Sequence, residues 1–198
     1  FLFLKDNIVA VDEKNNRIET EKAEYDGNLK IFKTLGITKI ITSEGYKIEG
    51  ENVVADNEKK IISSDKNTII TDQDQNKIFL KSFKYQIESN IFKSVGLIEI
   101  EDKRDNKYEF SQLYIDTEKK EMIGTDSKAF MNEKSFKIDE RNKPRIFSNS
   151  IKVKDKNTTF DKSVFTMCDY RKNDKCPPWS IQAKKMMHNQ KKKTIYYD

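Results

Sequence analysis

The residue types that most often perform catalysis are scarce in this chain. His188 is the only histidine, so a serine–histidine or cysteine–histidine site would have to use it. It follows two methionines at the end of an expected strand, where an exposed hairpin-tip histidine is the simpler interpretation. Phosphate-loop, dinucleotide-binding and HExxH motifs are absent from the sequence. The many carboxylates belong mostly to turns, so we predict that the protein is not an enzyme and uses no cofactor.

The two cysteines, Cys168 and Cys176, are separated by seven residues. Zinc would need two further ligands at close spacing, which the single histidine does not supply, so we expect no metal site. A disulfide fits an oxidising compartment, and closing so short a loop would stabilise by roughly 2.6 kcal/mol in the chain-entropy model. The thiols could instead pair with cysteines elsewhere in a longer chain, or remain free and buried.

Charge is abundant but evenly mixed. The chain has 38 basic and 33 acidic residues, a net charge of +5, and 36% charged against 35% hydrophobic residues. Interspersed charges are typical of a solvated surface, whereas a nucleic-acid footprint would gather its basic residues on one face. Only residues 191–193 form a basic run, so we expect no nucleic-acid partner. The modest apolar content, with aromatics at 11%, favours a thin, elongated β structure over a compact sphere.

The elements that must hold any site are short strands. Alternating patterns and polar turns dominate, and helical periodicity is nearly absent. Residues 147–153 place Phe147, Ile151 and Val153 on one expected face. Residues 79–87 do the same for four apolar residues. Polar turns of one style separate the runs, because Asp and Asn tolerate tight hairpin geometry. They are residues 12–16, 56–60, 72–76, 102–106 and 116–120.

An internal repeat appears when the chain is shifted by 60 residues. The run Phe-Lys-Thr-Leu-Gly-Ile at 32–37 aligns with Phe-Lys-Ser-Val-Gly-Leu at 92–97, and the Glu-Lys-Lys of 58–60 aligns with 118–120, without a gap. Such similarity marks stacked supersecondary units in which each layer covers the apolar face of the next. We therefore predict an all-β repeat domain over residues 1–163, followed by a cysteine-containing capping or junction segment over residues 164–198.

The chain starts without Met, has no apparent signal peptide, and ends in a Tyr-Tyr-Asp that reads as mid-strand. No apolar stretch approaches the ~18 residues of a membrane helix. We expect a mature segment or a fragment of an extracytoplasmic protein, whose chain continues beyond the final Tyr-Tyr-Asp.

The C-terminal segment resembles a known family. Four short runs carry the resemblance: Phe-Thr-Met-Cys at 165–168, Cys-Pro-Pro-Trp-Ser-Ile-Gln-Ala at 176–183, Met-His-Asn at 187–189 and Lys-Thr-Ile-Tyr-Tyr-Asp at 193–198. Together they look like the junction motif of the outer-membrane protein that assembles lipopolysaccharide. This is the OstA or LptD family, in its alphaproteobacterial form. In that family the motif ends the periplasmic domain just before a transmembrane barrel.

The upstream region is similar to the repeated strand units of the same family. The similar stretches include residues 6–8, 16–18, 23–26 and 36–38. The resemblance thus covers essentially the whole chain, but the barrel and its cysteines are absent. Cys168 stands where family members carry a cysteine that pairs with the barrel, so the resemblance also implies that alternative to a bond with Cys176.

The resemblance implies a twisted β-jelly roll, or β-taco, of stacked antiparallel hairpins that form two facing sheets. It also implies a periplasmic domain at the outer membrane of a Gram-negative bacterium, in which an apolar slot between the sheets conducts lipid A acyl chains towards the barrel. The implied partners are lipopolysaccharide, a periplasmic bridge protein that docks by β-augmentation near the N-terminus, and a barrel-plug lipoprotein reached through the barrel.

We expect inward-facing apolar residues to line the slot. The candidates are Ile40, Phe83, Ile98, Ile100, Phe110 and Ile151. A soluble bridge protein of the same fold is the alternative, although the Cys-Pro-Pro-Trp run argues against it. A protein of another class, an extracellular β-repeat binding module, would present an exposed ligand face instead of a slot.

Overall fold

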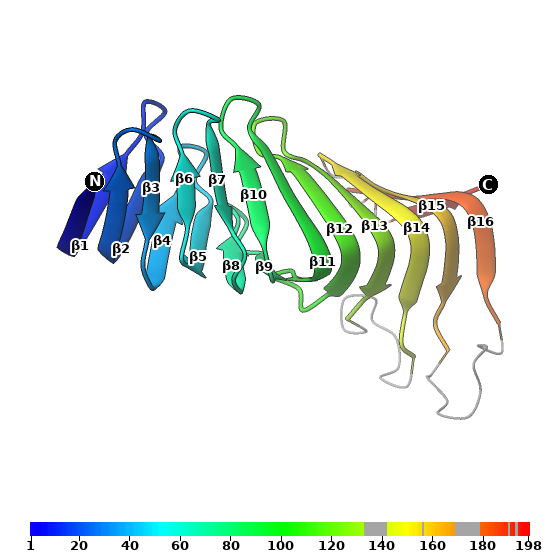
Figure 1. Ribbon diagram of the computed structural model, residues 1–198. Helices are drawn as coiled ribbons and strands as arrows, with labels where there is room; N and C mark the ends of the chain where they lie inside the picture. Colours follow the sequence, from blue (N-terminus) through cyan, green and yellow to red (C-terminus); the bar gives the residue numbers. More distant parts are fainter. Residues whose placement is uncertain (133–141, 156, 169–178, 190, 193) are drawn as a thin grey trace.

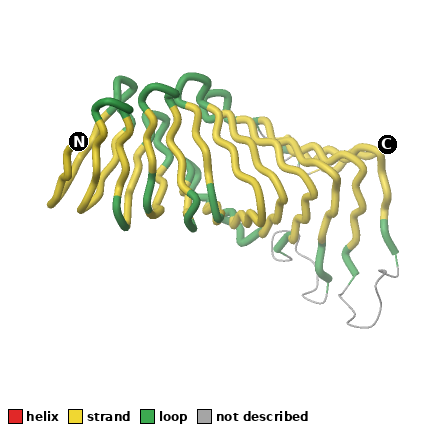
Figure 2. The backbone as a smooth tube through the Cα atoms, viewed as in Figure 1, coloured by secondary structure: helices red, strands yellow, loops and turns green. Residues whose placement is uncertain are grey.

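The computed structural model describes residues 1–132, 142–155, 157–168, 179–189, 191–192 and 194–198. These residues form strands, turns and loops, and the two termini lie at opposite ends of an elongated molecule (Figures 1 and 2). Within this described part no helix is long and apolar enough to cross a membrane. The strands join in one 17-stranded antiparallel sheet, which confirms the all-β prediction.

The strands of the N-terminal part are mostly short. They are β1 (Leu2–Val11), β2 (Arg17–Asp26), β3 (Ile31–Thr34), β4 (Ile37–Ile41), β5 (Lys47–Glu51), β6 (Val54–Asp56), β7 (Ile61–Ser64), β8 (Thr68–Thr71), β9 (Lys77–Leu80) and β10 (Phe83–Gln86). The strands of the C-terminal part are mostly long. They are β11 (Ile91–Glu101), β12 (Lys107–Asp116), β13 (Glu121–Phe130), β14 (Arg145–Lys154), β15 (Asn157–Thr166), β16 (Ile181–Asn189) and β17 (Thr194–Tyr197).

The sheet is folded along its length into two facing halves. β2 pairs with β3 through one end and with β4 through the other, and β11 does the same with β10 and β9. Strands β3, β6, β7 and β10 therefore belong to one half, which we call half-sheet A. Strands β4, β5, β8 and β9 belong to the other, half-sheet B. The two facing layers of the predicted jelly roll are thus halves of a single continuous sheet. We call the line along which the sheet folds the crease, and the long strands cross it.

At the crease the inward-facing positions change phase. Phe110 and Leu113 of β12 both face inward although three positions separate them, and strict alternation would put them on opposite faces. Positive φ angles accompany the change, at Gly36 (92°) and Gly96 (114°), the two glycines that the 60-residue repeat aligned. For the same reason Phe147 lies on the outer face while Ile151 is buried, so the single face predicted for residues 147–153 is wrong.

Buried hydroxyls satisfy the backbone where the crease interrupts the strand ladder. The Thr34 hydroxyl, 1% exposed, accepts from the Val53 N–H at 2.8 Å and from the Thr38 hydroxyl at 2.6 Å. Further along, the Ser64 and Ser94 hydroxyls donate to carbonyls across the crease, each at 2.7 Å. Leaving a buried backbone group unpaired costs about 1–3 kcal/mol, and this row of hydroxyls avoids that cost where the sheet folds sharply.

The predicted domain boundary at residues 163 and 164 lies inside β15, and the sheet continues through β16. The role of residues 164–198 as a junction stays a prediction.

Candidate functional site: an apolar slot between the half-sheets

Two rows of inward-facing side chains run along the molecule, one on each half. On half-sheet B the strand register aligns six isoleucines side by side, and the row continues through long strands. Row B consists of Ile18, Ile40, Ile48, Ile70, Ile78, Ile100, Tyr108, Ala129, Ile146, Phe165 and Ile181. Such a ladder is the result of a fixed register, because a one-residue slip would turn every member outward.

The facing row on half-sheet A is more aromatic. Row A consists of Tyr25, Phe32, Ala55, Ile62, Tyr85, Phe92, Ile115, Met122, Val153, Thr158 and His188. No member of either row is an acid, a lysine or an arginine. The slot between the half-sheets is therefore lined by mostly apolar rows, with the polar Thr158 and His188 at the C-terminal end of row A.

The slot is not equally open along its length. The C-terminal hollow, about 400 Å³, lies between Ile78, Ile100 and Tyr108 on one side and residues of β12–β15 such as Met122 and Ile151 on the other. The N-terminal hollow, about 290 Å³, lies between Ile18 and the row-A residues Tyr25 to Ile62. Between them is the waist, where Tyr46, Ile48 and Ile70 meet Tyr85, Phe92, Ile115 and Thr117 and leave only about 10 Å³. Such a space holds one water molecule at most.

The six predicted slot residues are all buried, at 0–6% exposure, but they occupy different places. Ile100 and Ile151 line the C-terminal hollow. Ile40 belongs to row B and is packed in the core. Phe83, Ile98 and Phe110 lie deeper, near the crease, where Phe83 stacks on Phe92 with ring centroids 5.6 Å apart. Whether any of them contacts lipid stays a prediction.

Sequence reasoning missed the tyrosines at the slot's edge. Tyr46 and Tyr108 stand four and six residues after the first residue of their turns, and their inward direction follows from the turn register. Recognising that the turns recur every 30 residues would have found them. Phe79, predicted to share a face with Phe83, lies instead on the outer side of β9.

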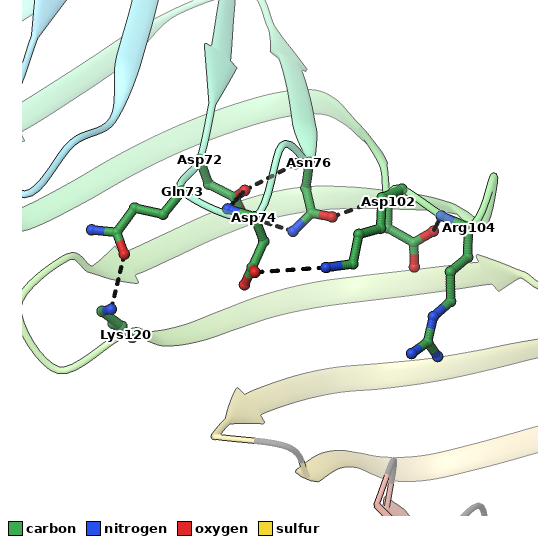
Figure 3. Close-up of polar contacts among 8 residues, drawn as sticks. Asp72, Gln73, Asp74, Asn76, Asp102, Arg104 and Lys120 are labelled. Carbon is green, nitrogen blue, oxygen red and sulfur yellow. Dashed lines mark hydrogen bonds and ion pairs between the residues drawn. The ribbon is translucent and has the colours of Figure 1, made fainter.

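The rim of half-sheet B is a stack of nearly identical turns at 12–16, 42–46, 72–76 and 102–106. In each, the first N–H donates to the carbonyl of the last residue at 3.0–3.1 Å, and the fourth residue has a positive φ. In three of them the closing asparagine donates to the opening aspartate at 2.7 Å. The same asparagine accepts an N–H from the following turn, as Asn76 does from Lys103 at 3.3 Å (Figure 3). Two such 30-residue steps make up the 60-residue repeat.

The rim of half-sheet A stacks in a similar way. The carbonyls of Lys30, Lys60 and Asn90 each accept an N–H from the next turn at 2.9–3.0 Å. All three residues have φ between 53° and 56°. In two of these turns, Asp56 and Asp116 each pair with a lysine three residues on at 2.8 Å, which lowers the pKa of the carboxyl group.

Two lysines bridge the mouth of the slot from rim to rim. The Lys14 ammonium donates to the Ile87 carbonyl at 2.7 Å. The Lys120 ammonium donates to Gln73 Oε1 at 2.9 Å, and Figure 3 shows it reaching across to the turn that carries Gln73. Beyond Lys120 the mouth widens into the C-terminal hollow, where carboxylates such as Asp102 and Asp155 stand at its edge.

Among the described residues, His188 and Cys168 lie at opposite ends of the β15–β16 pair and do not form a joint site. His188 is half-buried inside β16 rather than exposed at a hairpin tip, and burial together with nearby Arg104 lowers its pKa, which favours the neutral ring. Cys168 follows β15 and is half-buried, with its carbonyl accepting from Arg145 at 2.6 Å. Cys176 lies outside the described residues, so the cysteine pairing stays a prediction. Among the described residues, no cluster of three or more His, Cys, Asp or Glu could hold a metal ion.

A shallow groove on the outer face of half-sheet B has a volume of about 430 Å³, similar to that of the C-terminal hollow. It lies near the crease beside Ile37, which is 72% exposed, and Leu97, which is 54% exposed. Glu49, Glu51 and Glu99 also border it. This groove is separate from the slot.

Sequence comparisons do not assign this chain to a family. No family model matches the chain, and no curated protein matches it. Among solved structures, a similar chain is LptH from Pseudomonas aeruginosa, described as the LptA-homologous periplasmic component of the lipopolysaccharide transport device. The match has 18% sequence identity and a TM-score of 0.48, and it covers 57% of this chain and 83% of that one.

Proposed function

We propose that this chain is a lipid conduit that shelters acyl chains in the slot between its half-sheets. The observation that carries the proposal is the pair of uncharged rows that face each other along the whole sheet, with two hollows between them. Removing an acyl chain from water gains roughly 0.8 kcal/mol per CH₂ group, so a chain held between the apolar rows is stabilised over one left in water. Sheltering an acyl chain in this way needs no catalytic group.

We further propose that the lipid is lipopolysaccharide and that the chain is a periplasmic domain of the outer-membrane protein that assembles it. The support is the junction motif over residues 165–198, which resembles that family, together with the slot. The lipid would pass from the N-terminal end towards the C-terminal end, where the mouth is wider. The barrel-plug lipoprotein would be met only through the barrel.

Photo-crosslinking in cells tests the conduit. A photoreactive residue at Ile100 or at Ile151, inside the C-terminal hollow, is expected to form adducts with lipopolysaccharide. The neighbouring outward positions Glu99 and Lys152 are matched controls on the same strands and are expected to form none. Equal labelling at inward and outward positions, or none at either inward one, would contradict the proposal.

The edge strand β1 is the proposed docking site for a periplasmic bridge protein. In the described residues β1 pairs only with β2, so its other edge is free to accept a strand. Its apolar side chains are exposed, including Leu2 at 58% and Val11 at 60%. Crosslinkers at Phe3 or Val9 are expected to capture the bridge protein, and one at Ile37, which is exposed but not on an edge, is expected not to. Capture from Ile37 alone would move the docking site elsewhere.

A soluble bridge of the same fold is the second candidate. It is favoured by the opposite end of the sheet, where β17 pairs only with the last part of β16 within the described residues. Unpaired edges at both ends of the described part of the sheet would suit stacking of copies into a row. Light scattering of the purified chain decides between the two: growth into long oligomers with concentration favours a bridge, and a persistent monomer favours the outer-membrane domain.

A further inference from the structure

The slot holds two cavities that the waist keeps apart. The N-terminal and C-terminal hollows measure about 290 and 400 Å³, while the waist between them leaves about 10 Å³. A methylene chain cannot pass through so small a space unless the side chains that fill it move. The two hollows are therefore separate compartments in this structure.

Two tyrosines meet at the waist from opposite half-sheets. Tyr85 is 2% exposed, and its hydroxyl donates to Asn90 Oδ1 at 3.2 Å, which anchors it to the rim of half-sheet A. Tyr46 comes from the rim turn of half-sheet B and lines both the waist and the C-terminal hollow. Its hydroxyl has no hydrogen-bond partner among the described residues, so its ring is the less restrained of the two.

Tyr46 also breaks the regular rim. The 30-residue step would place an asparagine at this position, as at Asn16, Asn76 and Asn106, where the side chain ties one turn to the next. Because Tyr46 cannot make that link, Gln73 makes it instead, through its side-chain amide to the Glu44 carbonyl. A departure from a local rule with a compensating contact is typical of a functional position.

The mouth beside the waist is closed on both sides. Lys14 bonds to Ile87 over the N-terminal side, and Lys120 bonds to Gln73 over the C-terminal side. An acyl chain that left the slot to pass around the waist would have to break these contacts and enter water. The shortest apolar path between the hollows therefore runs through the tyrosine pair.

We propose that the two hollows are distinct acyl-chain sites and that Tyr46 is a gate between them, swinging against the fixed ring of Tyr85. This inference rests on the proposed conduit function. A gate of this kind holds a chain in the N-terminal hollow until the C-terminal hollow is free, and the ring returns once the chain has passed.

The test compares lipid adducts in the two compartments in cells. A photoreactive residue replaces Ile62 in the N-terminal hollow or Ile151 in the C-terminal hollow, and the ratio of adducts at 151 to adducts at 62 is measured. Tyr46→Trp, which enlarges the gate, is expected to lower this ratio at least about fivefold. Tyr46→Ala, which removes it, is expected to raise the ratio. Tyr114→Ala is the matched control, because Tyr114 lies on the outer face of β12 beside Lys93 and lines neither hollow, and it is expected to leave the ratio unchanged.

The outcomes separate the two proposals. If both inward positions form adducts but neither Tyr46 variant changes the ratio relative to the Tyr114 control, the gate is wrong and the conduit stands. If neither position forms adducts in the unmodified chain, the conduit itself fails and the gate with it. Because the two Tyr46 variants are expected to shift the ratio in opposite directions, misfolding of one of them cannot imitate the predicted result.

Discussion

The N-terminal and C-terminal parts of the sheet form their two facing half-sheets in different ways. From β3 to β10 each half-sheet has its own short strands, which stop at the crease and restart beyond it, and the mouth is closed by lysine bridges. From β11 to β15 the strands are 10 or 11 residues long and cross the crease without stopping. The waist lies where the two kinds of strand meet, since Ile48 and Ile70 come from short strands and Phe92 comes from a long one, while the larger hollow lies mostly among the long strands. The comparison shows that the slot is tightest where the short strands give way to the long ones.

The largest expected difference between the two parts concerns core truncation. Ile70 packs in the waist at 2% exposure, whereas Ile100, in the same row, borders a hollow of about 400 Å³. Ile70→Ala should cost about 3–4 kcal/mol and Ile100→Ala about half as much, because less packing is lost beside an existing cavity. Urea unfolding of both variants measures this, and equal losses would mean that the hollow is as tightly packed as the waist.

A glycine in the long strands should be less replaceable than one in the N-terminal part. A Cβ atom on Gly124 would lie 2.3 Å from the Phe110 ring, whereas one on Gly27 would lie 3.8 Å from its nearest neighbour, at an ordinary contact distance. Gly124→Ala should therefore destabilise by about 1–3 kcal/mol through overpacking. Thermal melts are expected to show a clear drop for Gly124→Ala and little change for the Gly27→Ala control. A melt of Gly124→Ala equal to wild type would show that the Phe110 ring yields freely.

The hydroxyls at the crease should differ between the parts as well. Thr34→Val leaves the Val53 N–H without its acceptor, while the Thr38 hydroxyl can still donate to the Gly36 carbonyl, and should cost about 1–3 kcal/mol. Ser163, in the long strand β15, has a buried hydroxyl with no partner among the described residues. Ser163→Ala should be neutral or slightly stabilising in the same unfolding assay. A large loss at Ser163 would reveal a hydrogen bond that the crease needs there.

The smallest effect is a pH dependence at the waist. Burial, with Asp72 and Glu44 nearby, raises the pKa of Tyr46 to about 12 from an ordinary value of 10.0. Since the unfolded chain loses this proton first, the stabilisation is complete below pH 10 and is lost as the pH rises towards 12. Tyr46→Phe should therefore reduce the loss of stability between these two pH values. An identical pH profile for the variant would place the Tyr46 hydroxyl in water.

The sequence predicted the strands, the turn style and the all-β fold well, because alternation and Asp- or Asn-rich turns are local signals. It missed the phase change at the crease, where Phe110 and Leu113 both turn inward, because that depends on the fold of the whole sheet. It found the 60-residue repeat through the glycines at the crease, but not the 30-residue step, since Thr42 and Tyr46 replace the Asp and Asn of the other turns. For the slot, it selected inward residues such as Ile40 and Ile100. The distance between the half-sheets decides which of these residues border a hollow. That distance cannot be read from the sequence pattern of a single strand.

The 30-residue step of the rim also sets the length of the sheet. Each step adds two strands to each half-sheet, and strands lie about 4.8 Å apart, so one step lengthens the sheet by roughly 10 Å. Along each rim the turns of one step bond to those of the next, as Asn76 does to Lys103, and apart from the lysine bridges between the rims a step can in principle be inserted or deleted without redesigning the rest. The distance that the molecule spans is therefore encoded in the number of its turns, and length can change in evolution by duplication while the cross-section of the slot stays the same.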